Sequence, residues 1–214
     1  MTQTSRLSAV RASYDAVAVD HARLLGDALD ARPLDRALLN AFAECVRGGA
    51  VADLGCGTGR VTAYLDGLGV RAFGVDLSPA MVAVARRSYP GLRFDVGRMA
   101  GLDMADGVLG GVLAWYSTVH TPPDELPALF AEFARVLAPG GHALVAFEAG
   151  DERRRLEHAY GHPVDLEVYG TPPDLVASLL AGAGLAEVAR MVREPDAGEH
   201  GPQGFLLARR ERDA

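Results

Sequence analysis

Lysine and isoleucine are missing from this 214-residue sequence, and Asn40 is its only asparagine. The codons of these three residues are rich in A and T, so their scarcity indicates a GC-rich bacterial genome. The absence of lysine also excludes a phosphate-binding P-loop, because that motif ends in Gly-Lys-Ser/Thr.

Cysteine is scarce, and long apolar runs are absent. The two cysteines, Cys45 and Cys56, argue against a disulfide framework and favour a reducing compartment. No stretch approaches the roughly 18 uncharged apolar residues of a membrane span. The opening MTQTSRLSAVRASYDAVAVDH lacks the apolar core of a signal peptide. We therefore expect a cytoplasmic protein without a membrane segment.

Basic residues are outnumbered by acidic ones. The chain has 21 of the former and 28 of the latter, a formal net charge of -7, which makes it a poor partner for the phosphate backbone of nucleic acid. No CxxC or HExxH spacing occurs, so no metal is expected. Hydrophobic residues make up 49% of the chain, enough for the core of one domain. We expect a small-molecule substrate and a monomer or homodimer.

The order of apolar patterns indicates an α/β fold. Residues 5–47 carry apolar side chains at helical spacing and are predicted to form two helices. Apolar runs and helical patterns then alternate, which implies right-handed crossovers and a parallel sheet with helices on both faces. Strands are expected at 50–54, 71–76, 92–97, 110–116 and 142–148, and helices at 58–68, 79–88 and 123–137.

The pattern changes after residue 148. Residues 149–171 are polar with several aromatics and no clear period, so an irregular, lid-like insertion is predicted, with DERRR at 151–155 as a solvated helix face. A helix at 172–182 and strands at 185–192 and 204–210 follow, the strands as an antiparallel pair at the sheet edge.

The chain is thus predicted to be a single domain, 1–214, with a Rossmann-like, doubly wound seven-stranded sheet. The sheet is mostly parallel, and its last strand is antiparallel. The parts are an N-terminal helical lid (1–47), a cofactor-binding core (48–148), the insertion (149–171) and a C-terminal helix and strand pair (172–214).

A glycine loop follows the first strand, in the sequence VADLGCGTGR at 51–60. In doubly wound sheets, ligands bind at the carboxyl ends of the strands. The glycines at 55, 57 and 59 do not fit the G-x-G-x-x-G spacing of dinucleotide sites. Asp53 would also repel a pyrophosphate. Taken alone, the loop is also compatible with a tight turn that binds nothing.

A second acid narrows the choice of ligand. Asp76 ends the second predicted strand, 21 residues after Gly55, where a carboxylate can accept both hydroxyls of a ribose. The ligand should then bring a ribose to Asp76 and a cationic group to Asp53. S-adenosylmethionine has an adenosine, a sulfonium and an α-ammonium, and therefore fits both acids.

The segments VADLGCGTGR, GVDLSPAMVAVAR, AWYSTVH and VLAPGG resemble those of class I S-adenosylmethionine-dependent methyltransferases. The resemblance covers residues from about 10 to 210. It implies S-adenosylmethionine as cofactor and S-adenosylhomocysteine as product. It also implies cofactor contacts from Asp53, Gly55, Cys56, Gly57, Gly59, Asp76, Leu77, Met81, Met99 and Trp115.

Some of these positions carry alternatives. Asp53 would place the methionine end, Asp76 the ribose, and Leu77 with Met81 the adenine, but Met81 at helical spacing also suits ordinary core. Family members often have Gly-Asp after the third strand, whereas this chain has Arg98 there. The backbone of Met99 is then the remaining contact for the adenine amine.

The end of the fourth strand should face the reacting methyl group. Its sequence, WYSTVH, lacks the Asn/Asp-Pro-Pro-aromatic pattern of enzymes that methylate nucleobases or amides, which favours a small molecule. His120 is the candidate base, since an ordinary histidine titrates near neutrality. Its alternative is a loop histidine that caps the next helix.

Tyr14 and His162 complete the candidate catalytic set. The resemblance implies that an N-terminal tyrosine lies near the methionine carboxylate, although Tyr14 also fits a core position in its helix. His162 belongs to the predicted insertion, whose aromatic and imidazole groups suit a lid over a small-molecule pocket. A plain surface loop is the alternative.

Three functions are compatible with these residues. The first is a small-molecule methyltransferase, in secondary metabolism, with in-line transfer and His120 as base. The second is a non-methylating enzyme that uses the sulfonium as a fixed charge for a cyclisation or rearrangement. The third is a binding module without activity, which the intact Asp53, Asp76 and glycines disfavour.

Overall fold

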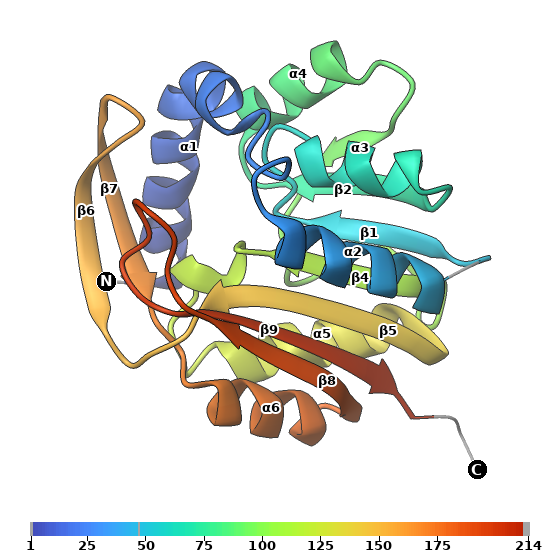
Figure 1. Cartoon of the computed structure of the whole chain (residues 1–214). Coiled ribbons are helices and arrows are strands. Elements are labelled where there is room, and N and C mark those ends of the chain that lie inside the picture. Colours follow the sequence, from blue (N-terminus) through green and yellow to red (C-terminus); the bar gives the residue numbers. More distant parts are fainter. Residues whose placement is uncertain (1, 47, 212–214) are drawn as a thin grey trace.

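A computed structural model describes residues 2–46 and 48–211. Its main sheet has seven strands in the order β3-β2-β1-β4-β5-β9-β8, which confirms the predicted doubly wound fold (Figure 1). The strands are β1 (Ala50–Leu54), β2 (Arg71–Asp76), β3 (Phe94–Val96), β4 (Leu109–Trp115), β5 (Leu137–Glu148), β8 (Leu185–Arg193) and β9 (Gln203–Arg210).

The strand directions create the binding edge. Strands β1 to β5 pair in parallel, whereas β9, the last strand of the chain, runs antiparallel to both β5 and β8, as predicted. Strand β1 lies between β2 and β4, so the connections leave it toward opposite halves of the sheet. A crevice therefore opens at the carboxyl ends of β1 and β4, where doubly wound sheets bind their ligands.

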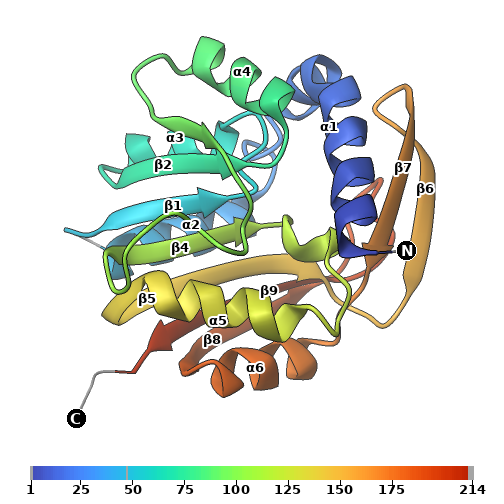
Figure 2. The ribbon, with the colours of Figure 1, turned by 180° about the vertical axis from the view of Figure 1, so that it is seen from behind.

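Helices cover both faces of the sheet. Helices α2 (Pro33–Cys45) and α3 (Arg60–Gly67) lie on one face, and α5 (Leu126–Val136) and α6 (Pro173–Gly182) lie on the other (Figures 1 and 2). Successive residues of β4 face opposite layers of helices. Val112 lies in the same apolar cluster as Phe133 of α5, and Leu113 in the same cluster as Phe42 of α2. This alternation explains why the strand is apolar throughout.

The long helix α1 (Gln3–Leu25) does not cover a face of the sheet. It stands beyond the carboxyl ends of the strands, next to α4 (Pro79–Ser88) (Figure 2). Val17 and Ala18 of α1 pack against Met81 and Val84 of α4. The N-terminal helix is therefore held over the binding edge by apolar contacts.

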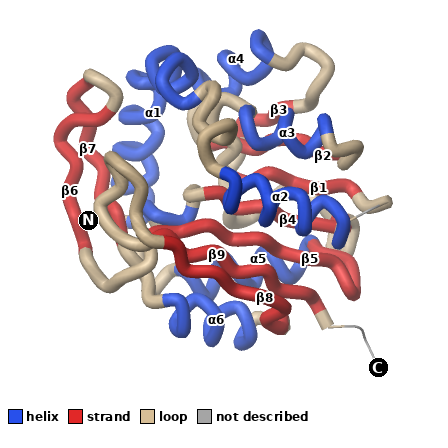
Figure 3. Tube along the Cα trace, in the orientation of Figure 1, coloured by secondary structure: helices blue, strands red, loops and turns tan. Residues whose placement is uncertain are grey.

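The segment 149–171 corrects the sequence prediction. It is a β-hairpin of β6 (Arg153–Ala159) and β7 (His162–Tyr169), separate from the main sheet (Figure 3), and DERRR forms no helix. Buried Leu166 and Val168 alternate with more exposed neighbours along β7. The turn is Tyr160-Gly161, with φ of 53° and 83°, and two such residues make the tight turn that suits a hairpin twist.

The chain around the predicted 123–137 helix also differs. Helix α5 begins only at Leu126, after the rigid Pro122-Pro123 pair, and the next strand already begins at Leu137 instead of 142. Leu137 pairs with Leu109, and the pairing of β4 with β5 has a register irregularity between Leu109 and Gly111, so Gly140 and Gly141 lie within β5. No helix in the described part of the chain has the length and hydropathy to cross a membrane.

Candidate functional site

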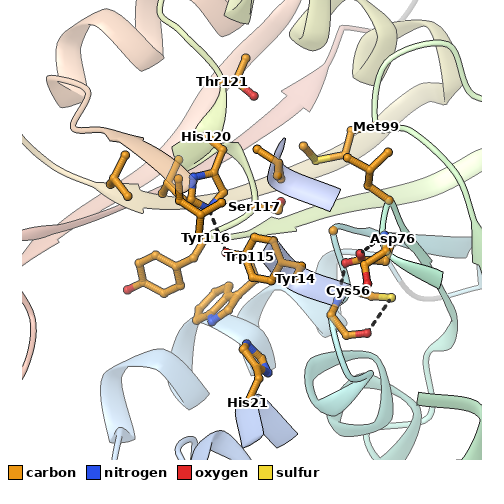
Figure 4. A pocket seen from close by; sticks show the side chains of 18 of the residues that line it. Tyr14, His21, Cys56, Asp76, Met99, Trp115, Tyr116, Ser117, His120 and Thr121 are labelled. Atoms are coloured by element: carbon orange, nitrogen blue, oxygen red, sulfur yellow. Dashed lines mark hydrogen bonds between the residues drawn. The ribbon is translucent and has the colours of Figure 1, made fainter. Parts of the chain in front are cut away.

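A cavity of about 720 Å³ lies at the carboxyl ends of the strands. Its floor is the glycine loop after β1, the end of β2 and the segment after β4, and α1 and the β6–β7 hairpin form its outer walls (Figure 4). Ten of the predicted site residues line it: Tyr14, Asp53, Gly55, Cys56, Gly57, Asp76, Leu77, Met99, Trp115 and His120. The crevice of the fold and the motifs of the sequence thus coincide.

Glycine is needed at the three loop positions for different physical reasons. All three have positive φ: 73° at Gly55, 55° at Gly57 and 83° at Gly59. A Cβ on Gly55 would stand 2.3 Å from Cβ of Ser117, and one on Gly59 would stand 2.7 Å from the ring of Phe94. A Cβ on Gly57 would meet nothing closer than 3.7 Å. Gly55 and Gly59 therefore serve packing, and Gly57 exposes bare backbone to the cavity.

Asp76 is held by the backbone at the edge of the cavity. Its Oδ2 accepts a hydrogen bond from the N–H of Gly57, and its Oδ1 accepts one from the N–H of Ser78, both at 2.8 Å. Burial raises the pKa of Asp76, and these two hydrogen bonds oppose the rise. Each carboxylate oxygen keeps a further lone pair. The carboxylate can accept the two hydroxyls of a ribose there.

Asp53 is a buried acid with only one of its two carboxylate oxygens hydrogen-bonded. Only 1% of the residue is exposed, and its Oδ2 accepts a hydrogen bond from the hydroxyl of Thr62 at 2.6 Å. Its Oδ1 is buried and has no hydrogen-bond partner among the described residues. Burial raises the pKa of Asp53 to about 7, and nearby Asp76 contributes. A buried acid of this kind is stabilised by a cation or a hydrogen-bond donor, and the ammonium of S-adenosylmethionine is both.

Three predicted residues do not line the cavity. Met81 is fully buried between α4 and α1, and Gly59 packs against Phe94. His162 lies on the hairpin, where its Nε2 is 2.8 Å from the carboxylate of Asp20 on α1. This contact fastens the hairpin to the helix. The roles first assigned to these three residues stay predictions that their positions do not favour.

His120 and Tyr14 meet across the cavity. His120 belongs to the short 3-10 turn η1 (Thr118–His120), and its Nδ1 lies 2.6 Å from the carbonyl oxygen of Glu167 on the hairpin. A carbonyl only accepts, so Nδ1 carries the proton and Nε2 presents a lone pair. The hydroxyl of Tyr14 lies 2.8 Å from Nε2 and therefore donates to it (Figure 4).

Burial sets the charge of this pair. It lowers the pKa of His120, against the opposing effect of the hydrogen bond to Glu167, so the imidazole is neutral near pH 7. Burial also raises the pKa of Tyr14 well above its ordinary value. The pair is thus a neutral phenol that donates to a neutral imidazole.

Sequence reasoning missed several polar groups in the cavity. The hydroxyl of Tyr116, the Oγ of Ser117 and the Nδ1 of His21 are buried and lack hydrogen-bond partners among the described residues. Tyr116 also has φ of 57°, which is rare outside glycine. Tyr116 and Ser117 adjoin Trp115 in the AWYSTVH segment, and His21 lies two helical turns after Tyr14. Their sequence spacing from the predicted site residues Trp115 and Tyr14 could have indicated that all three line the same cavity.

No sequence pattern predicted the charged cluster that lines another wall of the cavity. Arg193, at the end of β8, contacts Asp35 of α2 and Glu199 of the β8–β9 loop, and Arg32 also contacts Glu199. Burial raises the pKa of Tyr116 above its ordinary value, and nearby Asp35 contributes. These groups come from distant parts of the chain. No group of three or more His, Cys, Asp or Glu in the described ranges could hold a metal ion.

Comparisons with known proteins agree with this geometry. The methyltransferase-domain family model matches residues 51–141. Demethylmenaquinone methyltransferase of Chlorobaculum parvum is 30% identical over 151 residues, which are 68% of this chain and 62% of the relative. Trans-aconitate 2-methyltransferase of Delftia acidovorans is 34% identical over 117 residues, 50% of this chain and 40% of that protein. The chain therefore spans about two fifths to three fifths of the length of these relatives.

One solved structure resembles almost the whole chain. It is 1,6-didemethyltoxoflavin-N1-methyltransferase of Burkholderia thailandensis, with bound 1,6-didemethyltoxoflavin and S-adenosylhomocysteine. The TM-score is 0.76 and the identity 25%, over 99% of this chain and 91% of that one. Together with the glycine loop and the two acids, these matches identify the chain as a class I S-adenosylmethionine-dependent methyltransferase by family, with S-adenosylmethionine as its cofactor.

Asp76→Ala is expected to weaken the binding of S-adenosylhomocysteine at least tenfold, because two hydrogen bonds to a charged acceptor are lost at roughly 1.5–3 kcal/mol each. Isothermal titration calorimetry measures this. Asp95→Ala, on the neighbouring strand β3 and paired with Arg93, is the control and should bind like the parent. Parent-like affinity of Asp76→Ala would remove Asp76 from the ribose site.

The affinity for S-adenosylhomocysteine should also depend on pH through Asp53. Its ionised form attracts the ligand's ammonium, and its pKa is about 7, so affinity should rise about tenfold from about pH 6 to about pH 8. Titration calorimetry over this range is the measurement. 5′-Methylthioadenosine, which lacks the amino group, should bind without this dependence. A flat profile for the parent, or an unchanged slope in Asp53→Asn, would contradict the assignment.

Proposed function

We propose that the protein transfers the methyl group of S-adenosylmethionine to a small, planar heteroaromatic molecule, at a nitrogen or oxygen that loses a proton. The observation that carries this proposal is the hydrogen bond from the hydroxyl of Tyr14 to the lone pair of His120 Nε2 inside the cavity. It provides a path for a proton out of the cavity.

The cofactor supplies an activated methyl group on a sulfonium. Asp53, Asp76 and the backbone at Gly57 would orient it, which converts the transfer into a reaction within one complex. On methyl transfer to the acceptor atom, the cofactor's sulfur would be the leaving group and would keep the electron pair of the carbon–sulfur bond. The acceptor's proton passes to the Tyr14 oxygen while Tyr14's own proton moves to His120 Nε2.

The hairpin would stabilise the end state of this transfer. The resulting imidazolium keeps its Nδ1–H on the carbonyl of Glu167, a hydrogen bond that already favours the charged form of His120. After product leaves, His120 returns the proton to solvent. His120 is then the base, and Tyr14 is the group that touches the acceptor.

The strength of this base indicates the class of acceptor. Because burial lowers the pKa of His120, the imidazole is a weak base, and it serves best when the acceptor N–H or O–H is itself acidic. Such protons occur on electron-poor heteroaromatic rings and enols, and not on aliphatic alcohols or amines. The similar Burkholderia thailandensis protein, a 1,6-didemethyltoxoflavin-N1-methyltransferase, agrees with this class.

The walls of the cavity support a polar and small acceptor. The hydroxyls of Tyr116 and Ser117 are unpaired among the described residues, and Asp35 and Glu199 line the same cavity. About 720 Å³ is the size of ordinary ligand pockets and must hold the cofactor as well. The net charge of -7 disfavours nucleic acid. A role in secondary metabolism, cytoplasmic location, and a monomeric or homodimeric state remain predictions.

His120→Ala and Tyr14→Phe are each expected to lower turnover about 10²–10⁴-fold, because either change breaks the proton path. 1,6-Didemethyltoxoflavin and related heteroaromatic lactams are the acceptors to supply, and release of S-adenosylhomocysteine is the readout. Affinity for S-adenosylhomocysteine should stay within a few-fold of the parent value. Tyr64→Phe, which removes an exposed hydroxyl bonded to Asn40, is the matched control.

The pH profile provides a second criterion. A base must be neutral, and the pKa of His120 lies below its ordinary 6.5, so parent turnover should rise with pH through a value under 6.5 and then level off. Full turnover in both variants would mean that the acceptor needs no base. Product formation without release of S-adenosylhomocysteine would favour the alternative function, in which the sulfonium acts only as a fixed charge.

A further inference from the structure

His21 stands over the glycine loop. It follows Tyr14 by two turns of α1, on the same side of the helix. Its Cε1 lies 3.7 Å from the point where a Cβ on Gly57 would stand. The imidazole packs against two aromatic rings, with centroids at 4.9 Å for Tyr160 and 6.5 Å for Tyr14, both edge to face. Its position is thus fixed before any ligand arrives.

The imidazole has a nitrogen without a partner. Nδ1 of His21 is buried and makes no hydrogen bond to the described residues, although the ring lines the cavity. Buried polar atoms of this kind are nearly always paired in proteins. Burial, with a contribution from Arg60, lowers the pKa of His21 to about 4. The ring is neutral, and one of its nitrogens is a donor.

The charges of this part of the cavity call for such a donor. Asp53 and Asp76 suit the ammonium and the ribose of S-adenosylmethionine, but both repel the carboxylate of its amino-acid end. Arg6, Arg11 and Arg32 line the cavity already paired with acids. His120 is bonded to Tyr14 and Glu167. Nδ1 of His21 has no such partner among the described residues, and nearby Arg60 adds positive charge.

We propose that His21 donates a hydrogen bond to the carboxylate of the cofactor's amino-acid end. The resemblance to the family implied this place for Tyr14, whose hydroxyl is engaged with His120. Helix α1 then divides two tasks between two side chains: Tyr14 serves the acceptor, and His21 serves the cofactor. The inference concerns the cofactor alone and does not depend on which acceptor is methylated.

Calorimetry with three ligands tests this directly. S-adenosylhomocysteine has the carboxylate, its decarboxylated analogue lacks only that group, and 5′-methylthioadenosine lacks the whole amino-acid end. His21→Ala should weaken S-adenosylhomocysteine about tenfold or more, since a hydrogen bond to a charged group is lost. It should leave the other two ligands within about twofold of the parent, which also shows that the pocket is intact.

Two further variants sharpen the result. His21→Asn places an amide nitrogen close to the position of Nδ1 and should recover most of the affinity for S-adenosylhomocysteine alone. His158→Ala removes an exposed histidine of the hairpin and should bind all three ligands like the parent. Equal losses for S-adenosylhomocysteine and its decarboxylated analogue, in His21→Ala or in His21→Asn, would overturn the proposal, as would an unchanged affinity for S-adenosylhomocysteine.

Discussion

The site depends first on the hydrogen bond from the N–H of Gly57 to the carboxylate of Asp76. It ties the loop after β1 to the end of β2 and holds Gly57 at a φ of 55° that a glycine accepts without strain. With the loop fixed, Gly55 seats against Ser117 after β4 and Gly59 against Phe94 of β3. The carboxyl ends of β1, β2 and β4 are thereby joined beside the cavity, and Gly59 anchors the loop to the start of β3. Asp76 also lies close enough to Asp53 to help raise the pKa of Asp53, so a cationic ligand would stabilise its charged form.

A second set of contacts builds the outer wall from segments that belong to neither half of the sheet. The hairpin is fastened to α1 by the bonds of His162 to Asp20 and of the Asp165 N–H to Ser13. Because the hairpin also supplies the carbonyl of Glu167 to His120, it fixes which imidazole nitrogen faces Tyr14. Packing of the hairpin on α1 therefore sets the hydrogen bonding of His120, the base of the proposed mechanism. Loss of the hairpin would change the tautomer of His120 as well as the shape of the pocket.

The sequence predicted the sheet because the information is local. Apolar runs, the Ser78-Pro79 helix start and the glycine loop each lie within a few residues, and all were found close to their predicted positions. The hairpin was missed because Leu156 and Ala159 are the only apolar residues of β6, so the short alternation of Val164, Leu166 and Val168 in β7 had no matching pattern in its partner strand. Tyr160-Gly161 was its one strong signal. Tyr14 and His120 both line the cavity, but their bond spans 106 positions, and no pattern along a single chain reports such a contact.

The most direct test of this binding site is a crystal structure with S-adenosylhomocysteine bound. Both ribose hydroxyls should bind the carboxylate of Asp76, and the ammonium should bind Oδ1 of Asp53, which has no other partner among the described residues. The amino-acid end should lie beside Gly57, under α1. Tyr14 should keep its bond to His120 and face the side of the sulfur that would carry the methyl group. A ligand that lies elsewhere in the cavity, or a ribose with no contact to Asp76, would contradict it.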